Sequence, residues 1–233
     1  MSEALKREAA GRAVAEIRSG MKVGLGTGST ARHFVDLLGE KVRAGMDIVG
    51  VPTSEATASQ ARECGIPLSD LDTLARLDVT VDGADEIDGD LNLIKGAGGA
   101  LLREKIVAAA SDAMIVIADD TKVVEALGGR FPLPVEVNRF GLGATRALVQ
   151  RLVDGHGTDG WVKLRGEEAG TPFETDGGHL ILDAFFGRIS QPEALSNELL
   201  NIPGVVQHGL FLNMCRKAYV ATPNGVETLL KGN

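Results

Sequence analysis

The chain has 233 residues, 44% of them hydrophobic, and carries a formal net charge of −8 at pH 7. This is enough for one large core, or for one core with a smaller satellite domain. The negative charge argues against a nucleic-acid surface, which needs dense lysine and arginine patches. The first residues lack the apolar core of a signal peptide, and no apolar run is long enough to span a bilayer. We therefore expect a cytoplasmic protein with neither a membrane nor a nucleic acid as partner.

Cysteine and histidine do not occur in patterns that indicate disulfides or metal sites. Cys64 and Cys215 form no C-x-x-C pair and are too few for a disulfide framework, which favours a reducing compartment. The four histidines show neither H-x-H nor H-E-x-x-H spacing. The sequence thus predicts no metal site.

Helices and apolar strands alternate through the first half of the chain. Apolar residues at positions 10, 13, 14 and 17 predict an amphipathic helix that ends at Gly20. Further helices are expected around residues 34–38, from Ser54 to Cys64, and from Ala100 to Ala110. The predicted strands are Lys22 to Leu25, Ile48 to Val51, Leu77 to Val81, and Met114 to Ala118. This alternation predicts an α/β fold, with a Rossmann-like parallel sheet, helices on both faces, and ligands beyond the carboxyl ends of its strands.

The pattern changes after Phe131 to strand, helix, strand, strand, helix, strand, which is the ferredoxin-like order. The predicted elements are Val135 to Val137, Ala144 to Leu152, Trp161 to Leu164, Leu180 to Asp183, Pro192 to Leu200, and Val205 to Phe211. A strand from Ala218 to Thr222 and a last helix are expected to return to the first domain. We therefore expect a catalytic domain at 1–130 and 208–233, interrupted by a smaller ferredoxin-like α+β domain at 131–207.

The first candidate loop is glycine-rich and lies between a predicted strand and a helix. It contains Gly26, Thr27, Gly28, Ser29 and Thr30. Exposed backbone N–H groups and the helix dipole at such a position favour an anion. The loop lacks the last glycine of a dinucleotide fingerprint and the lysine of a Walker A loop. A tight turn that merely uses the freedom of glycine remains an alternative.

Acidic residues follow the predicted strand that ends at Val81, in the order Asp82-Gly83-Ala84-Asp85-Glu86-Ile87-Asp88. Carboxylates at this edge of a parallel sheet can act as bases, accept hydrogen bonds from sugar hydroxyls, or bind a metal. A calcium loop is disfavoured because Leu93 stands where glycine is needed. For Asp88 and Asp90, a solvated turn is the better interpretation.

Two further loops complete the candidate site. The segment that begins Lys95-Gly96-Ala97-Gly98 leads into a helix in which Glu104 lies about one turn from the start, where it can point back toward Lys95. A buried glutamate there could be a general base, whereas a lone glutamate more often forms a surface ion pair. Lys122 follows the strand that ends at Ala118 and could bind a phosphate, although alone it would be an ordinary exposed lysine.

Taken together, the four loops and the segments F-P-L-P-V-E-V and I-P-G-V-V-x-x-G-L-F resemble the type A ribose-5-phosphate isomerases over nearly the whole chain. The resemblance implies interconversion of ribose 5-phosphate and ribulose 5-phosphate, in the non-oxidative pentose phosphate pathway. It implies an enzyme without metal or nucleotide cofactor that forms a homodimer or homotetramer. Ala97 and Thr121 depart from the common family pattern, as does the segment from Gly166 to Thr175.

The resemblance also implies roles for individual residues. Glu104 corresponds to the base that carries the proton through an enediolate, with Asp82, Asp85 and Lys95 as its polar partners. The implied substrate-binding residues are Gly26, Thr27, Gly28, Ser29, Thr30, Asp82, Gly83, Ala84, Asp85, Lys95, Gly96, Ala97, Gly98, Lys122 and Lys6. Which aspartate assists ring opening stays open.

Two other classes of protein remain as alternatives. Coenzyme A transferases and amino-sugar phosphate deaminases have related α/β folds, and fold alone does not determine function. A sugar-phosphate sensor of a transcription regulator would keep the phosphate loop without a base, but no basic recognition helix is visible in this sequence.

Overall fold

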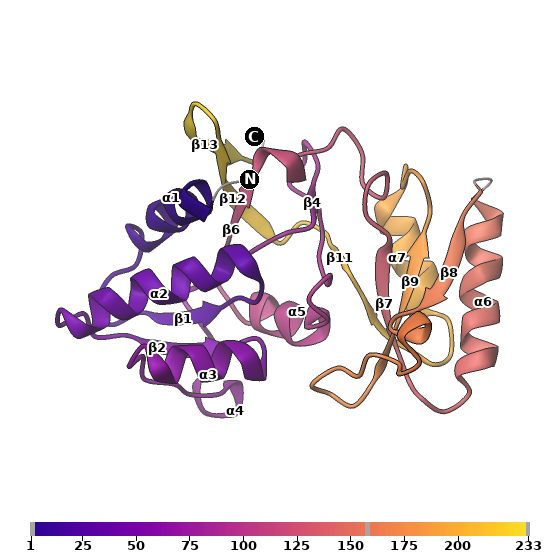
Figure 1. The fold of residues 1–233 in the computed structure, drawn as a ribbon, viewed down its shortest axis with the longest axis horizontal. Helices are drawn as coiled ribbons and strands as arrows, with labels where there is room; N and C mark the ends of the chain where they lie inside the picture. The colour runs from indigo at the N-terminus through magenta and orange to yellow at the C-terminus, as the bar shows by residue number, and fades with distance from the viewer. Residues whose placement is uncertain (1–2, 157–158, 232–233) are drawn as a thin grey trace. The chain divides into compact units, whose positions relative to one another are not determined.

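A computed structural model describes residues 3–156 and 159–231, which form two compact units (Figure 1). Unit 1 combines the residues up to Ala84 with Arg103–Val123 and the residues from Asn213 onward. Unit 2 combines Asp85–Leu102 with Val124–Leu212. These units are groups of residues in mutual contact, and the division into folding domains at 130/131 and 207/208 stays a prediction.

Unit 1 is built on a six-stranded sheet with the order β13-β12-β6-β3-β1-β2. Its strands are β1 (Lys22–Leu25), β2 (Val49–Pro52), β3 (Val79–Asp82), β6 (Met114–Asp119), β12 (Cys215–Thr222) and β13 (Gly225–Leu230). Neighbouring strands are parallel except for the antiparallel pair of β12 and β13. Every residue of β3 and β6 is buried, as expected for central strands of a sheet covered on both faces.

Helices cover both faces of this sheet. They are α1 (Glu3–Val14), α2 (Ser29–Arg43), α3 (Glu55–Glu63), α4 (Leu71–Leu74) and α5 (Leu101–Ala109), followed by the short 3₁₀ helix η1 (Asp120–Lys122). Phe34 and Leu38 of α2 pack with α1 and the strands in the main core, whereas Val107 of α5 packs with Val51 and Leu77 in a separate cluster. The Oγ atom of Ser54 caps α3 by accepting a hydrogen bond from the N–H of Thr57 at 3.1 Å.

Unit 2 contains the ferredoxin-like motif. Its elements are β7 (Leu133–Val137), α6 (Leu142–Gly155), β8 (Trp161–Leu164), the 3₁₀ helix η2 (Glu167–Ala169), β9 (Leu180–Phe185), α7 (Pro192–Leu200) and β10 (Val205–His208). The four strands form an antiparallel sheet with the order β10-β7-β9-β8. Val149 of α6 and Leu195 of α7 are fully buried against this sheet. The predicted fold class, a helix-covered parallel sheet plus a ferredoxin-like α+β domain, is confirmed.

Unit 2 also contains a small three-stranded sheet with the order β11-β5-β4, formed by β4 (Glu86–Ile87), β5 (Leu93–Ile94) and β11 (Leu210–Phe211). The single strand predicted from Val205 to Phe211 is therefore wrong, because β10 and β11 belong to different sheets. The chain changes sheet at Gly209, where a side chain would collide with the carbonyl oxygen of Lys95.

The predicted C-terminal helix is also wrong, because β12 and β13 form a hairpin with Thr222 paired to Gly225. The turn contains Pro223, Asn224 and Gly225, and Gly225 has a φ of 120°. A left-handed glycine beside proline and asparagine favours a tight turn and not a helix. β-Branched residues then continue along the edge of the sheet.

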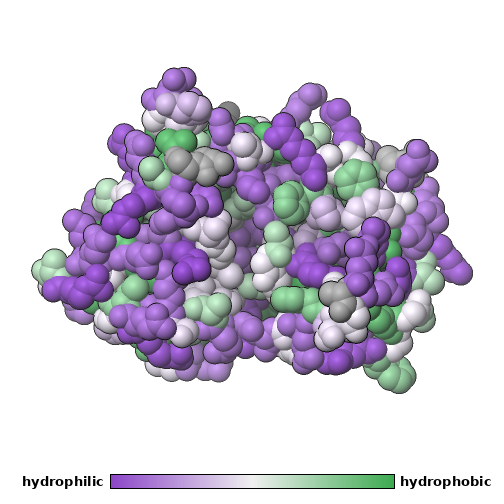
Figure 2. All heavy atoms as spheres, in the orientation of Figure 1, coloured by the Kyte–Doolittle hydropathy of each residue, from purple (hydrophilic) through white to green (hydrophobic). Residues whose placement is uncertain are grey.

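The face of the molecule drawn in Figure 2 is mostly hydrophilic, with apolar side chains in small separate groups. Phe140, Leu230 and Ile106 are the most exposed large apolar side chains of the described residues. Across residues 3–156 and 159–231, no helix has the length and apolar character needed to cross a membrane.

Candidate active site

The glycine loop of unit 1 is held by the strand beside it. The N–H of Gly26 donates to the carbonyl oxygen of Val81 at 2.9 Å, and a Cβ atom on Gly26 would lie only 2.5 Å from the Cα of Asp82. Glycine is therefore required here by the close approach of two backbones. Gly28, with a φ of 115°, is the N-cap of α2 and has no side chain to satisfy the first amides of the helix. The loop thus presents the positive end of a 15-residue helix.

The hydroxyl of Thr27 belongs to a cluster of hydroxyl groups. It lies 2.7 Å from Thr53 Oγ1, 2.8 Å from Ser54 Oγ and 3.1 Å from Thr57 Oγ1. Thr57 in turn donates to the carbonyl oxygen of Gly26 at 3.0 Å. This network fixes the loop from the side of α3. No local pattern predicted this network, because Thr27 is 26 residues from the nearest other member, Thr53.

Lys6 reaches the same loop from α1. Its Nζ atom donates to Ser29 Oγ at 3.2 Å and to Glu3 Oε1 at 2.9 Å. Hydrogen bonds from Lys6 and His33 hold the pKa of Glu3 below its ordinary value. The structure therefore places a cation beside Ser29, a position for which the sequence offered only the family resemblance.

Asp82 is the last residue of β3 and is completely buried. Its Oδ1 atom accepts hydrogen bonds from the N–H groups of Thr27 at 3.1 Å and Gly83 at 2.7 Å. One oxygen of this carboxylate thus joins the loop after β1 to the loop after β3.

Glu104 lies in the first turn of α5 and is only 4% exposed. Its neighbour Arg103 donates instead to Glu55 Oε1 at 2.9 Å. The alternative of a surface ion pair is therefore wrong for Glu104, since its side chain is not at the surface. The next residue, Lys105, is also desolvated, and burial lowers its pKa to about 7.

Lys122 lies at the end of η1, directly after β6. Asp119, the last residue of β6, caps this turn by accepting hydrogen bonds from the N–H group of Thr121 at 3.0 Å and from its hydroxyl. Within unit 1, Asp82 is the last residue of a parallel strand, and the Gly26–Thr30 loop and Lys122 follow the carboxyl ends of two others. The chain that leaves α5 at Ala110 pairs with Leu77 at the amino end of the sheet, so α5 begins toward the carboxyl edge. This is where ligands bind in open α/β sheets.

Unit 2 carries Asp85 and the loop from Lys95 to Gly98. The antiparallel pairing of β4 with β5 brings them together, with the N–H of Asp85 bonded to the carbonyl oxygen of Ile94 at 2.8 Å. Asp85 Oδ2 accepts a hydrogen bond from the N–H of Ala97, also at 2.8 Å. Lys95 is 2% exposed, and its Nζ lies 5.5 Å from the centre of the Phe211 ring. A desolvated ammonium over a ring is stabilised by a cation–π interaction.

The predicted catalytic residues thus fall into two pairs. Asp82 and Glu104 lie in unit 1, and Asp85 and Lys95 lie in unit 2. The prediction that all four share one cleft stays a prediction.

Glu86 has a structural role that the sequence did not reveal. This carboxylate is completely buried and accepts hydrogen bonds from the N–H groups of Gly128 at 2.6 Å, Arg130 at 2.8 Å and Phe131 at 2.7 Å. It ties the acidic motif to the segment that enters β7. Its conspicuous place in an acidic motif was the available signal, but the backbone donors are more than forty residues away.

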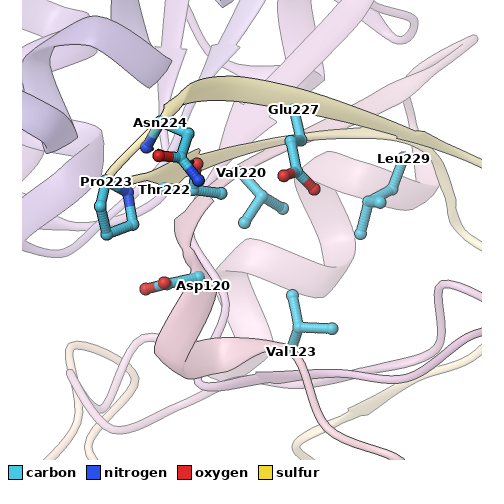
Figure 3. A pocket seen from close by; sticks show the side chains of 8 residues that line it. All are labelled: Asp120, Val123, Val220, Thr222, Pro223, Asn224, Glu227 and Leu229. Atoms are coloured by element: carbon cyan, nitrogen blue, oxygen red, sulfur yellow. Dashed lines mark hydrogen bonds between the residues drawn. The ribbon is translucent and has the colours of Figure 1, made fainter.

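Among the cavities lined by described residues of unit 1, two lie near the candidate loops. One of about 510 Å³ is lined by Gly28 and Ser29 together with residues of α3 and Arg32, so a further cation lies beside the glycine loop. The other, of about 380 Å³, lies between η1 and the β12–β13 hairpin (Figure 3). Figure 3 shows Asp120 and Glu227 on its walls among apolar side chains, a lining that does not favour an anion. In the described part of the chain, His, Cys, Asp and Glu side chains form no group of three that could hold a metal ion.

Comparisons with known proteins agree with this arrangement. The family model described as ribose 5-phosphate isomerase A (phosphoriboisomerase A) matches residues 49–225. Ribose-5-phosphate isomerase A of Rhodopseudomonas palustris (strain TIE-1) is 60% identical over 227 residues, covering 97% of both chains. The protein of that name from Bradyrhizobium diazoefficiens is 59% identical, covering 97% of this chain and 95% of the other.

Solved structures show the same likeness. Ribose 5-phosphate isomerase A from Methanocaldococcus jannaschii has a TM-score of 0.90 at 39% identity, covering 99% of this chain and 100% of the other. A D-ribose-5-phosphate isomerase in complex with phospho-erythronic acid has a TM-score of 0.91 at 41% identity, with the same coverage. The chain therefore belongs to the ribose-5-phosphate isomerase A family, and it is an isomerase.

Proposed function

We propose that this enzyme interconverts D-ribose 5-phosphate and D-ribulose 5-phosphate through an enediolate, with Glu104 as the base. The observation that carries the proposal is the burial of the Glu104 carboxylate in the first turn of α5, at the strand edge where unit 1 gathers its phosphate loop. The names of the relatives support the substrate. Phospho-erythronic acid, which a relative binds, is itself a phosphorylated sugar acid.

The phosphate is assigned to the glycine loop. Gly28 leaves the first amides of α2 available to an anion, and Ser29 adds a hydroxyl. Lys6 stands within hydrogen-bond distance of Ser29 and supplies a positive charge. Lys122 and the remaining loop residues, Gly26, Thr27 and Thr30, complete the set. The Thr27 hydroxyl is held by three other hydroxyls and its N–H by Asp82, so Thr27 contributes to binding by fixing the shape of the loop.

Proton transfer is assigned to Glu104. In the direction of ketose formation, the carboxylate removes the proton from C2 of the open-chain aldose and delivers it to C1, while the hydroxyl proton on O2 moves to O1. One carboxylate can perform both carbon transfers because it is regenerated in each cycle. Exclusion of water around the buried side chain favours return of the same proton to the substrate.

The negative charge of the enediolate needs a preorganised partner. Lys95 and the backbone N–H groups of Gly96 and Gly98 supply it, since donors already in place cost little reorganisation in the transition state. Asp82 or Asp85 accepts the hydroxyl proton during ring opening, beside the backbone of Gly83 and Ala84. The chemistry needs neither a metal nor a nucleotide. We further propose a cytoplasmic homodimer or homotetramer that acts in the non-oxidative pentose phosphate pathway.

The test is an isomerase assay with ribose 5-phosphate on the wild type and on Glu104→Gln, which keeps the shape but removes the base. We expect kcat to fall about 100-fold or more with a modest change in KM, the scale of a lost general base. Glu125→Gln changes a carboxylate that is 90% exposed and serves as the matched control. Full activity in Glu104→Gln, or no turnover by the wild type, would contradict the proposal.

A further inference from the structure

Arg165 and Asp183 form a bidentate ion pair at the end of β8. Nε of Arg165 donates to Oδ2 of Asp183 at 3.0 Å, and Nη2 donates to Oδ1 at 2.5 Å. Each side chain is 18% exposed, so solvent screens the pair only partly. The backbone of Arg165 is also fixed, since its N–H donates to Ile181 and its carbonyl oxygen accepts from Phe173. The guanidinium is therefore held in one orientation.

The third nitrogen of the guanidinium holds the loop from Lys95 to Gly99. Nη1 of Arg165 donates to the carbonyl oxygen of Gly96 at 2.7 Å and to that of Ala97 at 3.1 Å. Phe173, whose ring lies 5.9 Å from Cζ of Arg165, fills the space in which a Cβ atom on Gly99 would collide. Arg165 and Phe173 thus contact the loop at positions 96, 97 and 99.

These contacts determine where the N–H groups of the loop point. In a planar trans peptide, the N–H points opposite to the carbonyl of the same peptide unit. The unit that joins Gly96 to Ala97 therefore has its carbonyl on Arg165 and its N–H on Asp85. The carbonyl of Ala97 is also directed to Arg165, so the N–H of Gly98 faces the side of the loop that carries Asp85.

We propose that the Arg165–Asp183 pair sets the conformation of the 95–99 loop and thereby the rate of isomerisation, so that Arg165 is a positioning residue. This inference rests on the proposed function, in which Lys95 and the loop amides stabilise the enediolate. Arg165 binds the carbonyl groups of the loop, on the side opposite to the N–H groups that are assigned to the enediolate. Lysine cannot replace it, because one ammonium cannot reproduce the planar fork that serves Asp183 and two carbonyls at once.

The test compares Arg165→Met, Arg165→Lys and Asp183→Asn with the wild type. Arg139→Met is the matched control, because Arg139 pairs with Glu174 in the same unit at a site where both side chains are more than half exposed. The measurements are kcat and KM for ribose 5-phosphate, the melting temperature, and deuterium uptake by the peptide containing residues 95–99.

For Arg165→Met we expect kcat to fall about tenfold or more, while KM changes less than about threefold, because misplaced donors weaken transition-state stabilisation more than substrate binding. Deuterium uptake of the 95–99 segment rises. Arg165→Lys does not restore kcat. The double variant, Arg165→Met with Asp183→Asn, has a kcat no lower than that of Arg165→Met alone, as expected for two residues that act as a unit. Arg139→Met behaves like the wild type.

Unchanged kcat and unchanged loop exchange in a folded Arg165 variant would overturn the inference. So would an equal loss in Arg139→Met, or a loss of activity that only follows a lower folded fraction. If Arg165→Met does not fold, Arg165→Lys and Asp183→Asn decide by the same measurements. A wild type without isomerase turnover defeats the proposed function instead, and loop exchange in the Arg165 variants then decides the positioning role by itself.

Discussion

The Oδ1 atom of Asp82 accepts a hydrogen bond from the backbone N–H of Thr27 at 3.1 Å, which joins the loops that follow β3 and β1. The two residues are 55 positions apart, yet one buried carboxylate oxygen fixes the start of the glycine loop. Asp82 therefore has a structural role in addition to the catalytic role proposed for it.

Two substitutions of Asp82 separate these roles. Asp82→Ala removes the carboxylate that accepts hydrogen bonds from the N–H groups of Thr27 and Gly83. We therefore expect a higher KM, a lower kcat and a loss of about 1–3 kcal/mol of stability. Asp82→Asn keeps an oxygen acceptor and loses only the charge. Steady-state kinetics and urea denaturation check this. A stable Asp82→Asn with full activity would assign ring opening to Asp85.

Lys6→Met is expected to raise KM for ribose 5-phosphate about tenfold or more with little change in kcat. The reason is that a charge-assisted hydrogen bond to phosphate contributes about 1.5–3 kcal/mol to binding, in the ground state and the transition state alike. Steady-state kinetics at two salt concentrations measure this effect. Arg7 lies on the same helix as Lys6, and Arg7→Met, which breaks an exposed ion pair with Glu40 of α2, is the control. Equal effects in both variants would show a general effect of charge on α1.

Gly26→Ala is expected to destabilise the protein by about 1–3 kcal/mol or more, because the added methyl group would press against both the carboxylate and the backbone Cα of Asp82. Gly143→Ala is the matched control, since an added Cβ in that helical position meets nothing within 4 Å. The control should be neutral or slightly stabilising. Thermal melts of both variants provide the comparison, and equal melting temperatures would contradict the prediction.

Lys105 should make stability depend on pH. Burial lowers its pKa from 10.5 to about 7, so between these values the unfolded chain binds a proton that the folded chain has released. The free energy of unfolding therefore gains from this residue as pH rises from 7 toward 10.5, by at most about 1.4 kcal/mol per pH unit. As pH falls through this window, the gain is lost.

Lys105→Met removes this contribution, so the difference in unfolding free energy between wild type and variant should change across that window. Urea denaturation at several pH values measures it. Lys41→Met, at an exposed position of α2, is the control, and its difference in unfolding free energy from the wild type should not change with pH. A flat difference for Lys105→Met would contradict a desolvated lysine.

Local patterns in the sequence predicted the central elements well where periodicity and capping agree. The Ser54 cap of α3 and the fully buried strand β6 are examples, since both depend on residues close together in the chain. The C-terminal helix was predicted wrongly because β13 is an edge strand that, among the described strands, pairs only with β12, to which the turn before Gly225 connects it. Edge strands with mixed exposure carry a weak pattern.

The sequence by itself determined the α/β class, the family, and the order of the loops that carry the candidate residues, Glu104 among them. These depend on motifs of a few adjacent residues. Only the tertiary structure decided that Glu104 is buried, that Asp82 holds Thr27, and that Arg165 holds the carbonyls of Gly96 and Ala97. Each of the last two contacts joins residues more than fifty positions apart, and such pairs become neighbours only when strands pair and helices pack.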